Sequence, residues 1–293
     1  MKLAMIGLGK MGANMAERMR RHGHTVVGVD PDVPEADASS VTELPQLLEP
    51  RRIAWSMVPA GEVTSSVMGR LADLLEPGDL VVDGGNSNFR DTIRHGEMLA
   101  EAGVGFVDCG TSGGVWGLEE GYALMVGGSD DDVSTVTPLL EALAPPDGFA
   151  HVGPTGAGHF TKMIHNGVEY GMMQAYAEGY ALLDSAPFDV DVRAALGSWQ
   201  QGSVVRSWLL DLLVRALDET PELDGIASVA ADSGEGRWTV QEAVEAGVSA
   251  PVISAALFAR FTSQHRDDDV SMKVISALRN QFGGHTIERE TGG

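Results

Sequence analysis

The first twelve residues, MKLAMIGLGKMG (Met1–Gly12), decide the fold class of the N-terminal part of the chain. The apolar run Leu3–Ile6 leads directly into the pattern G-x-G-x-x-G, and a helical pattern follows. Gly7 allows a tight turn after a strand, Gly9 lets backbone N–H groups approach a pyrophosphate, and Gly12 lets helix and strand pack closely. The N-terminus of the helix adds unpaired donors and a partial positive charge. The loop therefore predicts a dinucleotide site on a Rossmann-type sheet.

Asp30 ends the next apolar run, Thr25–Val29, which reads as a second strand. A carboxylate at this place can accept hydrogen bonds from the hydroxyls of an adenosine ribose, and it would repel a 2′-phosphate. No Arg or Lys follows nearby to bind such a phosphate. NAD is therefore favoured as the cofactor, and NADP remains open.

Further apolar runs alternate with helical patterns through the first half of the chain. The predicted strands are residues 3–6, 25–29, 53–57, 80–82, 105–107, 123–126 and 149–152. Such repeated units predict a mainly parallel sheet covered by helices. After the glycine-rich stretch 153–158 one long helix is expected from Gly158 to Leu183, and helical segments dominate thereafter. The expected fold class is α/β, a doubly wound Rossmann-type domain (1–155) followed by an all-helical substrate and dimerisation domain (156–293) with an extended tail from Gly283.

Composition narrows the possible partners. The 293 residues are 43% hydrophobic, enough for ordinary cores, and the formal net charge of −22 argues against nucleic acids and anionic membranes. An anionic substrate would need a locally positive pocket within this negative field, whether the acidity reflects a salt-rich host or not. The single cysteine, Cys109, excludes an intramolecular disulfide, and no apolar run reaches membrane-spanning length. Because the chain starts as a strand and not as a signal peptide, a cytoplasmic protein is expected.

Three segments could carry chemistry: Val81–Ser87 and Thr111–Gly114, which each follow or end a predicted strand, and Gly158–Gly171. In the last segment, helical spacing places four polar side chains on one face: Lys162, Asn166, Glu169 and Tyr170. His165 lies on the neighbouring face of the same helix. A solvated face is the commoner fate of such charges, but this segment is otherwise rich in Met, Ile, Phe and Gly. A desolvated lysine can act as a base near neutral pH, and a glutamate can return a proton.

Two other kinds of site are rejected. His159, His165 and Glu169 do not follow the H-E-x-x-H spacing of a zinc site, and Cys109 has no second thiol. Ser112 lies in no G-x-S-x-G elbow, so a serine hydrolase is not expected. No metal is predicted.

Taken together, the motifs resemble the short form of the 6-phosphogluconate dehydrogenase family over nearly the whole chain. The resemblance rests on the glycine loop and on residues 58–61 (VPAG), 83–86 (DGGN), 112–114 (SGG), 162–171, 234–239 (GEGRWT), 256–260 (ALFAR) and 279–286 (RNQFGGHT). The segment around Lys162 and the segment 279–286 are its most specific parts.

The resemblance implies oxidative decarboxylation of 6-phosphogluconate to ribulose 5-phosphate and CO2, a step of the pentose phosphate pathway and of gluconate utilisation. Lys162 would take the proton of the C3 hydroxyl and, once protonated, polarise the ketone as CO2 leaves. Glu169 would then protonate C1. Implied substrate contacts are Asn86, Ser112, Gly113, Gly114, His165, Asn166 and, around the phosphate, Tyr170, Arg260, Arg279 and His285. Predicted cofactor contacts are Gly7, Leu8, Gly9, Lys10, Met11, Gly12, Asp30, Val58, Pro59, Ala60 and Asn86.

In this family the C-terminal tail, to which Arg279 and His285 are assigned, reaches into the neighbouring subunit, so a homodimer or dimer-based oligomer with tail exchange is implied. One departure is clear: longer members of the family carry a lysine just before the Gly-x-Gly-basic-Trp-Thr run, where this chain has Asp232 and Ser233. Arg237 is a possible compensating cation. The alternatives are a β-hydroxyacid dehydrogenase of the 3-hydroxyisobutyrate type on the same fold and, less favoured, a non-catalytic dinucleotide-binding protein.

Overall fold

The computed structural model describes residues 1–265, 269–284, 286, 287 and 289. It divides into two compact units, Met1–Lys162 and Met163–Gly293. The division falls inside helix α7, Ala157–Asp184, whereas the predicted boundary at residues 155/156 precedes that helix. Among the described residues, no helix combines the length and the apolar character that a membrane span requires.

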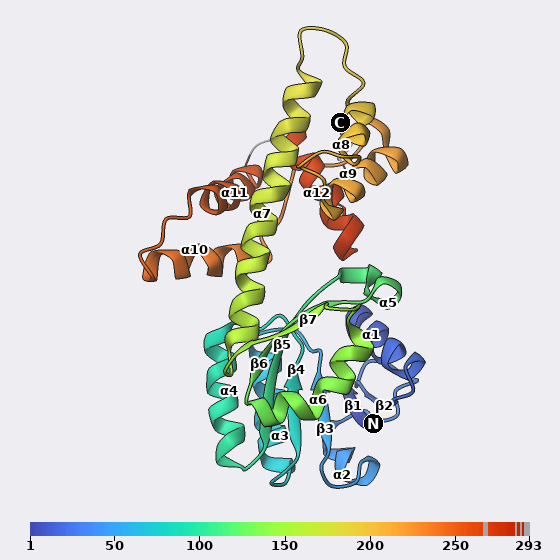
Figure 1. Cartoon of the computed structure of the whole chain (residues 1–293), viewed down its shortest axis with the longest axis vertical. Helices are drawn as coiled ribbons and strands as arrows, with labels where there is room; N and C mark the ends of the chain where they lie inside the picture. Colours follow the sequence, from blue (N-terminus) through green and yellow to red (C-terminus); the bar gives the residue numbers. More distant parts are fainter. Residues whose placement is uncertain (266–268, 285, 288, 290–293) are drawn as a thin grey trace. The chain divides into compact units, whose positions relative to one another are not determined.

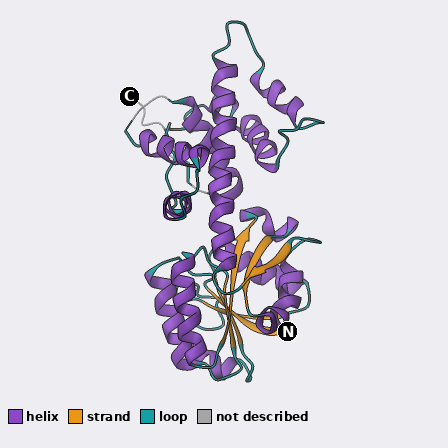
Figure 2. Cartoon of the chain, turned by 60° about the vertical axis from the view of Figure 1, so that its left-hand side comes forward, coloured by secondary structure: helices purple, strands orange, loops and turns teal. Residues whose placement is uncertain are grey.

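The first unit is built on one seven-stranded sheet with the order β2-β1-β3-β4-β5-β6-β7 (Figures 1 and 2). Strands β1 to β5 are parallel, β6 runs antiparallel to β5, and β7 is parallel to β6. The prediction of a mainly parallel sheet is confirmed. The strands are β1 Lys2–Ile6, β2 Thr25–Val29, β3 Ile53–Ser56, β4 Leu80–Asp83, β5 Gly105–Ser112, β6 Ala123–Gly128 and β7 Phe149–Gly153.

Helices cover both faces of this sheet, which explains why its strands read as continuous apolar runs instead of alternating ones. Side chains of α1 and α6 pack on one face, and those of α2, α3 and α4 pack on the other. The helical elements are α1 Lys10–Arg21, η1 Val41–Glu43, α2 Leu44–Leu47, α3 Glu62–Leu74, α4 Phe89–Glu101, η2 Gly114–Trp116, α5 Gly117–Glu120 and α6 Asp130–Leu143.

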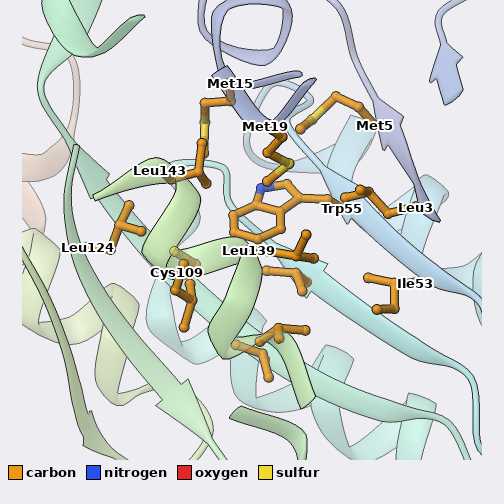
Figure 3. Close-up of a cluster of buried hydrophobic side chains, with 14 of the residues drawn as sticks. Leu3, Met5, Met15, Met19, Ile53, Trp55, Cys109, Leu124, Leu139 and Leu143 are labelled. Carbon is orange, nitrogen blue, oxygen red and sulfur yellow. The ribbon is translucent and has the colours of Figure 1, made fainter. Parts of the chain in front are cut away.

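Trp55 lies at the centre of the core on the face covered by α1 and α6 (Figure 3). Met15 and Met19 of α1 and Leu139 and Leu143 of α6 surround it, all fully buried. Full burial of one Met or Leu side chain contributes roughly 1.5–3 kcal/mol to the stability of the fold. Because successive strand residues point to opposite faces, neighbouring residues of each strand supply both cores. The sheet is therefore a rigid platform for the loops at its edge.

The second unit is helical (Figure 2). After α7 it contains α8 Val192–Trp199, α9 Trp208–Glu219, η3 Pro221–Leu223, α10 Glu235–Glu245, α11 Pro251–Ser263 and α12 Val270–Gly283. Side-chain caps mark several helix starts: Asp191 caps α8, Ser207 caps α9 and Asp269 caps α12. The predicted fold class, a Rossmann-type sheet followed by a helical domain, is confirmed.

The C-terminal segment corrects one expectation. Arg279, which the resemblance assigns to the C-terminal tail, lies on α12, and this helix ends at Gly283, where the extended tail was expected to begin. Its apolar residues Val274, Ile275 and Leu278 are buried, so packing extends the helix to this point. Gly284, with φ of 59°, ends it in the left-handed conformation that glycine adopts without strain. His285 lies outside the described residues.

Candidate active site

The glycine loop follows β1 at the carboxyl edge of the sheet. Gly7 has φ of 89°, and a Cβ there would lie 2.8 Å from the carbonyl oxygen of Met57. A Cβ on Gly12 would collide with the carbonyl oxygen of Gly7. Around Gly9, by contrast, a Cβ would meet no atom within 4 Å. Strand β1 lies between β2 and β3, so the loop opens where the strand order reverses, the usual ligand position of such sheets.

The start of α1 fits an anionic group. Gly9 occupies the N-cap, no side chain caps the helix, and no acidic residue lies in its first turn. In the same unit, by contrast, Asn88 caps α4 and Ser129 caps α6. The N-cap residue of α1 thus offers no side-chain acceptor of the kind that caps α4 and α6, and the helix dipole favours an anion there. The loop therefore suits a pyrophosphate.

Asp30 directly follows β2 and supports this loop. Its Oδ2 accepts a hydrogen bond from the backbone N–H of Leu8 at 2.7 Å, and its Oδ1 accepts one from Asp32 at 2.9 Å. Each carboxylate oxygen has a second acceptor position, which a ribose hydroxyl could use. Val58, Pro59 and Ala60 follow β3, the parallel neighbour of β1, and so lie at the same edge.

Asp83, which ends β4, organises the loop that carries Asn86. It is buried, its Oδ1 accepts from the N–H of Gly85 at 3.1 Å, and its Oδ2 accepts from the hydroxyl of Ser87 at 2.7 Å. A buried carboxylate that accepts hydrogen bonds from both sides of a short loop restricts its conformation. The position of Asn86 is therefore set by a strand residue.

Asp108 anchors the start of α7, a role that sequence reasoning missed. This fully buried residue of β5 accepts hydrogen bonds from the N–H groups of Gly156 at 2.7 Å and of His159 at 2.8 Å. A carboxylate at a helix N-terminus is stabilised by the helix dipole. Thr92 of α4 adds a 2.7 Å hydrogen bond to the ring Nδ1 of His159. The only signal in the sequence was a charged residue at the centre of an apolar strand.

Lys162 lies on α7 against strand β5. It is only 7% exposed, and a Cβ on Gly110 would collide with the Cβ of Lys162 and lie 2.9 Å from the carbonyl oxygen of Gly158. The absence of a side chain at Gly110 thus lets the first turns of α7 approach β5 closely. Ser112 ends the same strand two residues later. The first unit therefore brings Lys162 close to the predicted Ser112–Gly114 loop.

The other predicted catalytic residue, Glu169, lies two turns further along α7. His165 lies one turn before it, with its Nδ1 3.9 Å from the Glu169 carboxylate and 3.2 Å from the Oδ1 of Asn166. Both His165 and Glu169 are partly exposed. The predicted polar strip on one helix is thus present as a row of neighbouring groups.

Arg260, on α11, is the most unusual cation of the second unit. It is 2% exposed, and its guanidinium lies 3.4 Å from the centroid of the Tyr170 ring. It donates to the carbonyl oxygen of Ala231 at 3.3 Å, but among the described residues no carboxylate lies within ion-pair distance of it. Burial lowers the pKa of Arg260 to about 10; the charge of Arg279 also lowers it, while Tyr170, Glu169 and Asp232 raise it. Since burying an unpaired charge costs several kcal/mol, an anionic ligand would stabilise this arrangement.

The predicted residues divide between the units. Asn86, Ser112, Gly113, Gly114 and Lys162 belong to the first unit, and His165, Asn166, Glu169, Tyr170, Arg260 and Arg279 belong to the second. Within the second unit, the guanidinium of Arg260 on α11 lies against the Tyr170 ring of α7, and the charge of Arg279 on α12 acts on it as well. In the described part of the chain, no group of three His, Cys, Asp or Glu side chains could hold a metal ion.

Both units of the chain match known protein families. The NAD binding domain of 6-phosphogluconate dehydrogenase matches residues 2–153, and the C-terminal domain of 6-phosphogluconate dehydrogenase matches residues 158–275. The NAD(+)-dependent, decarboxylating 6-phosphogluconate dehydrogenase of Haloferax volcanii is 40% identical over 301 residues, covering 99% of each chain. The enzyme of the same name from Bacillus subtilis is 34% identical over 301 residues, 94% of this chain and 64% of that one.

Solved structures share the fold. A 6-phosphogluconate dehydrogenase of Plasmodium falciparum superposes with a TM-score of 0.81 at 24% identity, covering 96% of this chain and 70% of that one. A 3-hydroxyisobutyrate dehydrogenase of Mycobacterium tuberculosis superposes with a TM-score of 0.74, also at 24% identity, covering 93% and 97%. The fold is therefore common to both kinds of dehydrogenase, and the matches in sequence distinguish them. On that basis the first unit is a nicotinamide-dinucleotide-binding domain, and the chain belongs to the 6-phosphogluconate dehydrogenase family.

Proposed function

We propose that this chain catalyses the oxidative decarboxylation of 6-phosphogluconate to ribulose 5-phosphate and CO2, with NAD preferred over NADP. The observation that carries the proposal is Arg260, a guanidinium buried against the Tyr170 ring with no carboxylate within ion-pair distance among the described residues. A substrate that carries a phosphate would supply the missing negative charge. An unphosphorylated hydroxy acid would leave this charge without a partner.

The glycine loop, Asp30 and the segment after β3 would hold the dinucleotide, with its pyrophosphate at the N-terminus of α1. When bound, the nicotinamide supplies the acceptor for the hydride that leaves C3 of the substrate. Asp30 supports NAD because a carboxylate directly after β2, bound to the glycine loop, would repel a 2′-phosphate. The relative from Haloferax volcanii, which is named as NAD(+)-dependent, supports the same preference.

Lys162 is proposed as the general base. It takes the proton of the C3 hydroxyl as the C3–H bond breaks, which leaves a ketone at C3 beside the carboxylate-bearing C2. Protonated Lys162 then polarises that ketone, so the electron pair of the breaking C1–C2 bond moves toward C3 and CO2 departs without a metal. The burial of Lys162 against β5 supports this role, because it holds the side chain beside the strand that ends at Ser112.

Glu169 is proposed to protonate the carbon of the resulting enediol, which becomes C1 of ribulose 5-phosphate. Asn86, Ser112–Gly114, His165 and Asn166 are proposed to bind the sugar acid. Arg260 and Arg279, with Tyr170 beneath Arg260, are proposed to bind its phosphate. A homodimer with tail exchange, through which His285 would join this site, is part of the proposal. Exposed apolar side chains on α10 and α11, among them Val252 and Phe258, support a subunit interface.

Steady-state kinetics test the proposal. The chain is offered 6-phosphogluconate and 3-hydroxyisobutyrate, each with NAD and with NADP, while CO2 release is followed. We expect turnover of 6-phosphogluconate with NAD, one CO2 per reduced cofactor, and a mass of at least two chains by light scattering. Lys162→Met should abolish turnover, whereas Lys2→Met, at an exposed position, should not. Faster oxidation of 3-hydroxyisobutyrate without CO2 release would favour the β-hydroxyacid alternative.

A further inference from the structure

The hydroxyl of Tyr170 is fully engaged within the second unit. It donates its proton to Oδ1 of Asp232 at 3.0 Å and accepts a hydrogen bond from the backbone N–H of Ser233 at 3.2 Å. The hydroxyl of Ser233 lies 3.3 Å away on the same side. A phenol has a single proton to donate. A phosphate oxygen, which only accepts hydrogen bonds, therefore finds no donor at this hydroxyl.

Asp232 is itself held in place. Its side chain is 7% exposed, its Oδ1 also accepts from the N–H of Gly234 at 3.0 Å, and its Oδ2 lies 3.0 Å from both Nε and Nη2 of Arg237. Arg237 is 54% exposed and lies 5.0 Å from the ring centroid of Phe261. The carboxylate is thus neutralised from the solvent side by Arg237 and bound on its inner side by Tyr170. Ser233, which stands in place of the lysine of the longer family members, directly follows this paired carboxylate.

The ring of Tyr170 is closely packed against both Arg260 and Gly236. The guanidinium of Arg260 lies 3.4 Å from its centroid, and a Cβ on Gly236 would lie 2.6 Å from its Cδ2. Cation–π attraction is strongest when the cation is desolvated, as Arg260 is. A ring in this position fixes the plane of the guanidinium and therefore the direction in which its donors point.

We propose that Tyr170 serves the anion site through its aromatic ring and not its hydroxyl, and that Asp232 is the positioning residue that holds this ring beneath Arg260. The proposal rests on the proposed function, since the anion is the phosphate of the substrate. The pair of Asp232 and Arg237 then orders the site without adding net charge, and Arg260 and Arg279 supply the cations.

Three variants test the proposal by the separate effects on KM and kcat. Tyr170→Phe keeps the ring but removes its hydrogen bond to Asp232, so it should raise KM for 6-phosphogluconate by the same small factor as Asp232→Ala, less than about threefold. A hydroxyl that binds phosphate directly would instead give Tyr170→Phe an increase of about tenfold or more that Asp232→Ala does not share. Tyr170→Leu should raise KM by about 30-fold, the effect of losing a desolvated cation–π contact. Asp232→Ala should raise KM with kcat nearly unchanged, and it should add little in the Tyr170→Leu background.

Asp218→Ala is the matched control. Asp218 forms an equally close pair with Arg193, at 2.7 and 2.8 Å, in the same unit and without contact to Tyr170. This variant should leave KM unchanged. A KM increase equal to that of Asp232→Ala would show that loss of any such ion pair disturbs the site, and would overturn the positioning role.

Binding of inorganic phosphate, measured by titration calorimetry, separates this proposal from the proposed function. If the wild type does not turn over 6-phosphogluconate, the proposed function fails, but the phosphate affinities still rank the variants. Tyr170→Phe and Asp232→Ala should bind phosphate slightly, and equally, more weakly than the wild type, and Tyr170→Leu more weakly still. A loss of tenfold or more in Tyr170→Phe that Asp232→Ala does not share, or no phosphate binding by the wild type, overturns the proposal. Should Tyr170→Leu not fold, the comparison of Tyr170→Phe with Asp232→Ala decides.

Discussion

Replacing Gly110 by alanine tests whether the close approach of β5 to α7 sets the position of Lys162. The new methyl group would collide with the Cβ of Lys162 and lie 2.9 Å from the carbonyl oxygen of Gly158, so helix or strand must shift. Overpacking of this kind costs about 1–3 kcal/mol. A shift of about 1 Å at a catalytic group can lower the rate about 100-fold. We expect Gly110→Ala to lower the free energy of unfolding by about 1–3 kcal/mol and kcat on 6-phosphogluconate by roughly 100-fold.

The two effects are measured separately. Circular dichroism during urea unfolding gives the free energy of unfolding, and steady-state kinetics give kcat. Gly69→Ala is the matched control, because Gly69 lies within α3 and a Cβ there would meet no atom within 4 Å. That variant should gain about 0.5–1 kcal/mol, since alanine is the better helix former, with kcat unchanged. If Gly110→Ala has the same free energy of unfolding and the same kcat as the wild type, the reasoning is refuted, because the collision would then have no structural or catalytic consequence.

Two further predictions concern buried groups of the first unit. Burial raises the pKa of the Cys109 thiol to about 12, and the thiolate is the reactive form. The folded chain should therefore resist a thiol reagent at pH 8 and react only once it is unfolded in urea. Rapid labelling of the folded chain would contradict this. Burial also lowers the pKa of His95 below the 6.5 of an unfolded histidine, so its neutral form contributes stability above about pH 6.5 that is lost as the pH falls through the folded-state pKa. His95→Gln should thus reduce the difference between urea midpoints at pH 7 and pH 5, and an unchanged difference would show that other groups govern it.

Much of the fold could be predicted because its signals are local. Strands buried on both faces leave short apolar runs, and a glycine pattern between strand and helix marks the dinucleotide loop without reference to the rest of the chain. The long helix expected over 158–183 extends over Ala157–Asp184 in the structure. The helix α12 ends at Gly283, where glycines predicted the start of the tail, but the assignment of Arg279 to that tail was wrong, because burial of Val274, Ile275 and Leu278 keeps this segment helical.

The sequence by itself determined the order of elements, the dinucleotide loop and the row of polar groups on α7, since these depend on residues within one or two helical turns or one strand–loop–helix unit. Only the tertiary structure decided that Asp108 anchors α7, that Lys162 lies against Gly110, and that Tyr170 gives its proton to Asp232, 62 residues away. Periodicity shows which face of an element is buried, but not which side chain of a distant element meets it. Contacts between distant elements depend on close packing, in which a single added methyl group is enough to force neighbouring elements to shift.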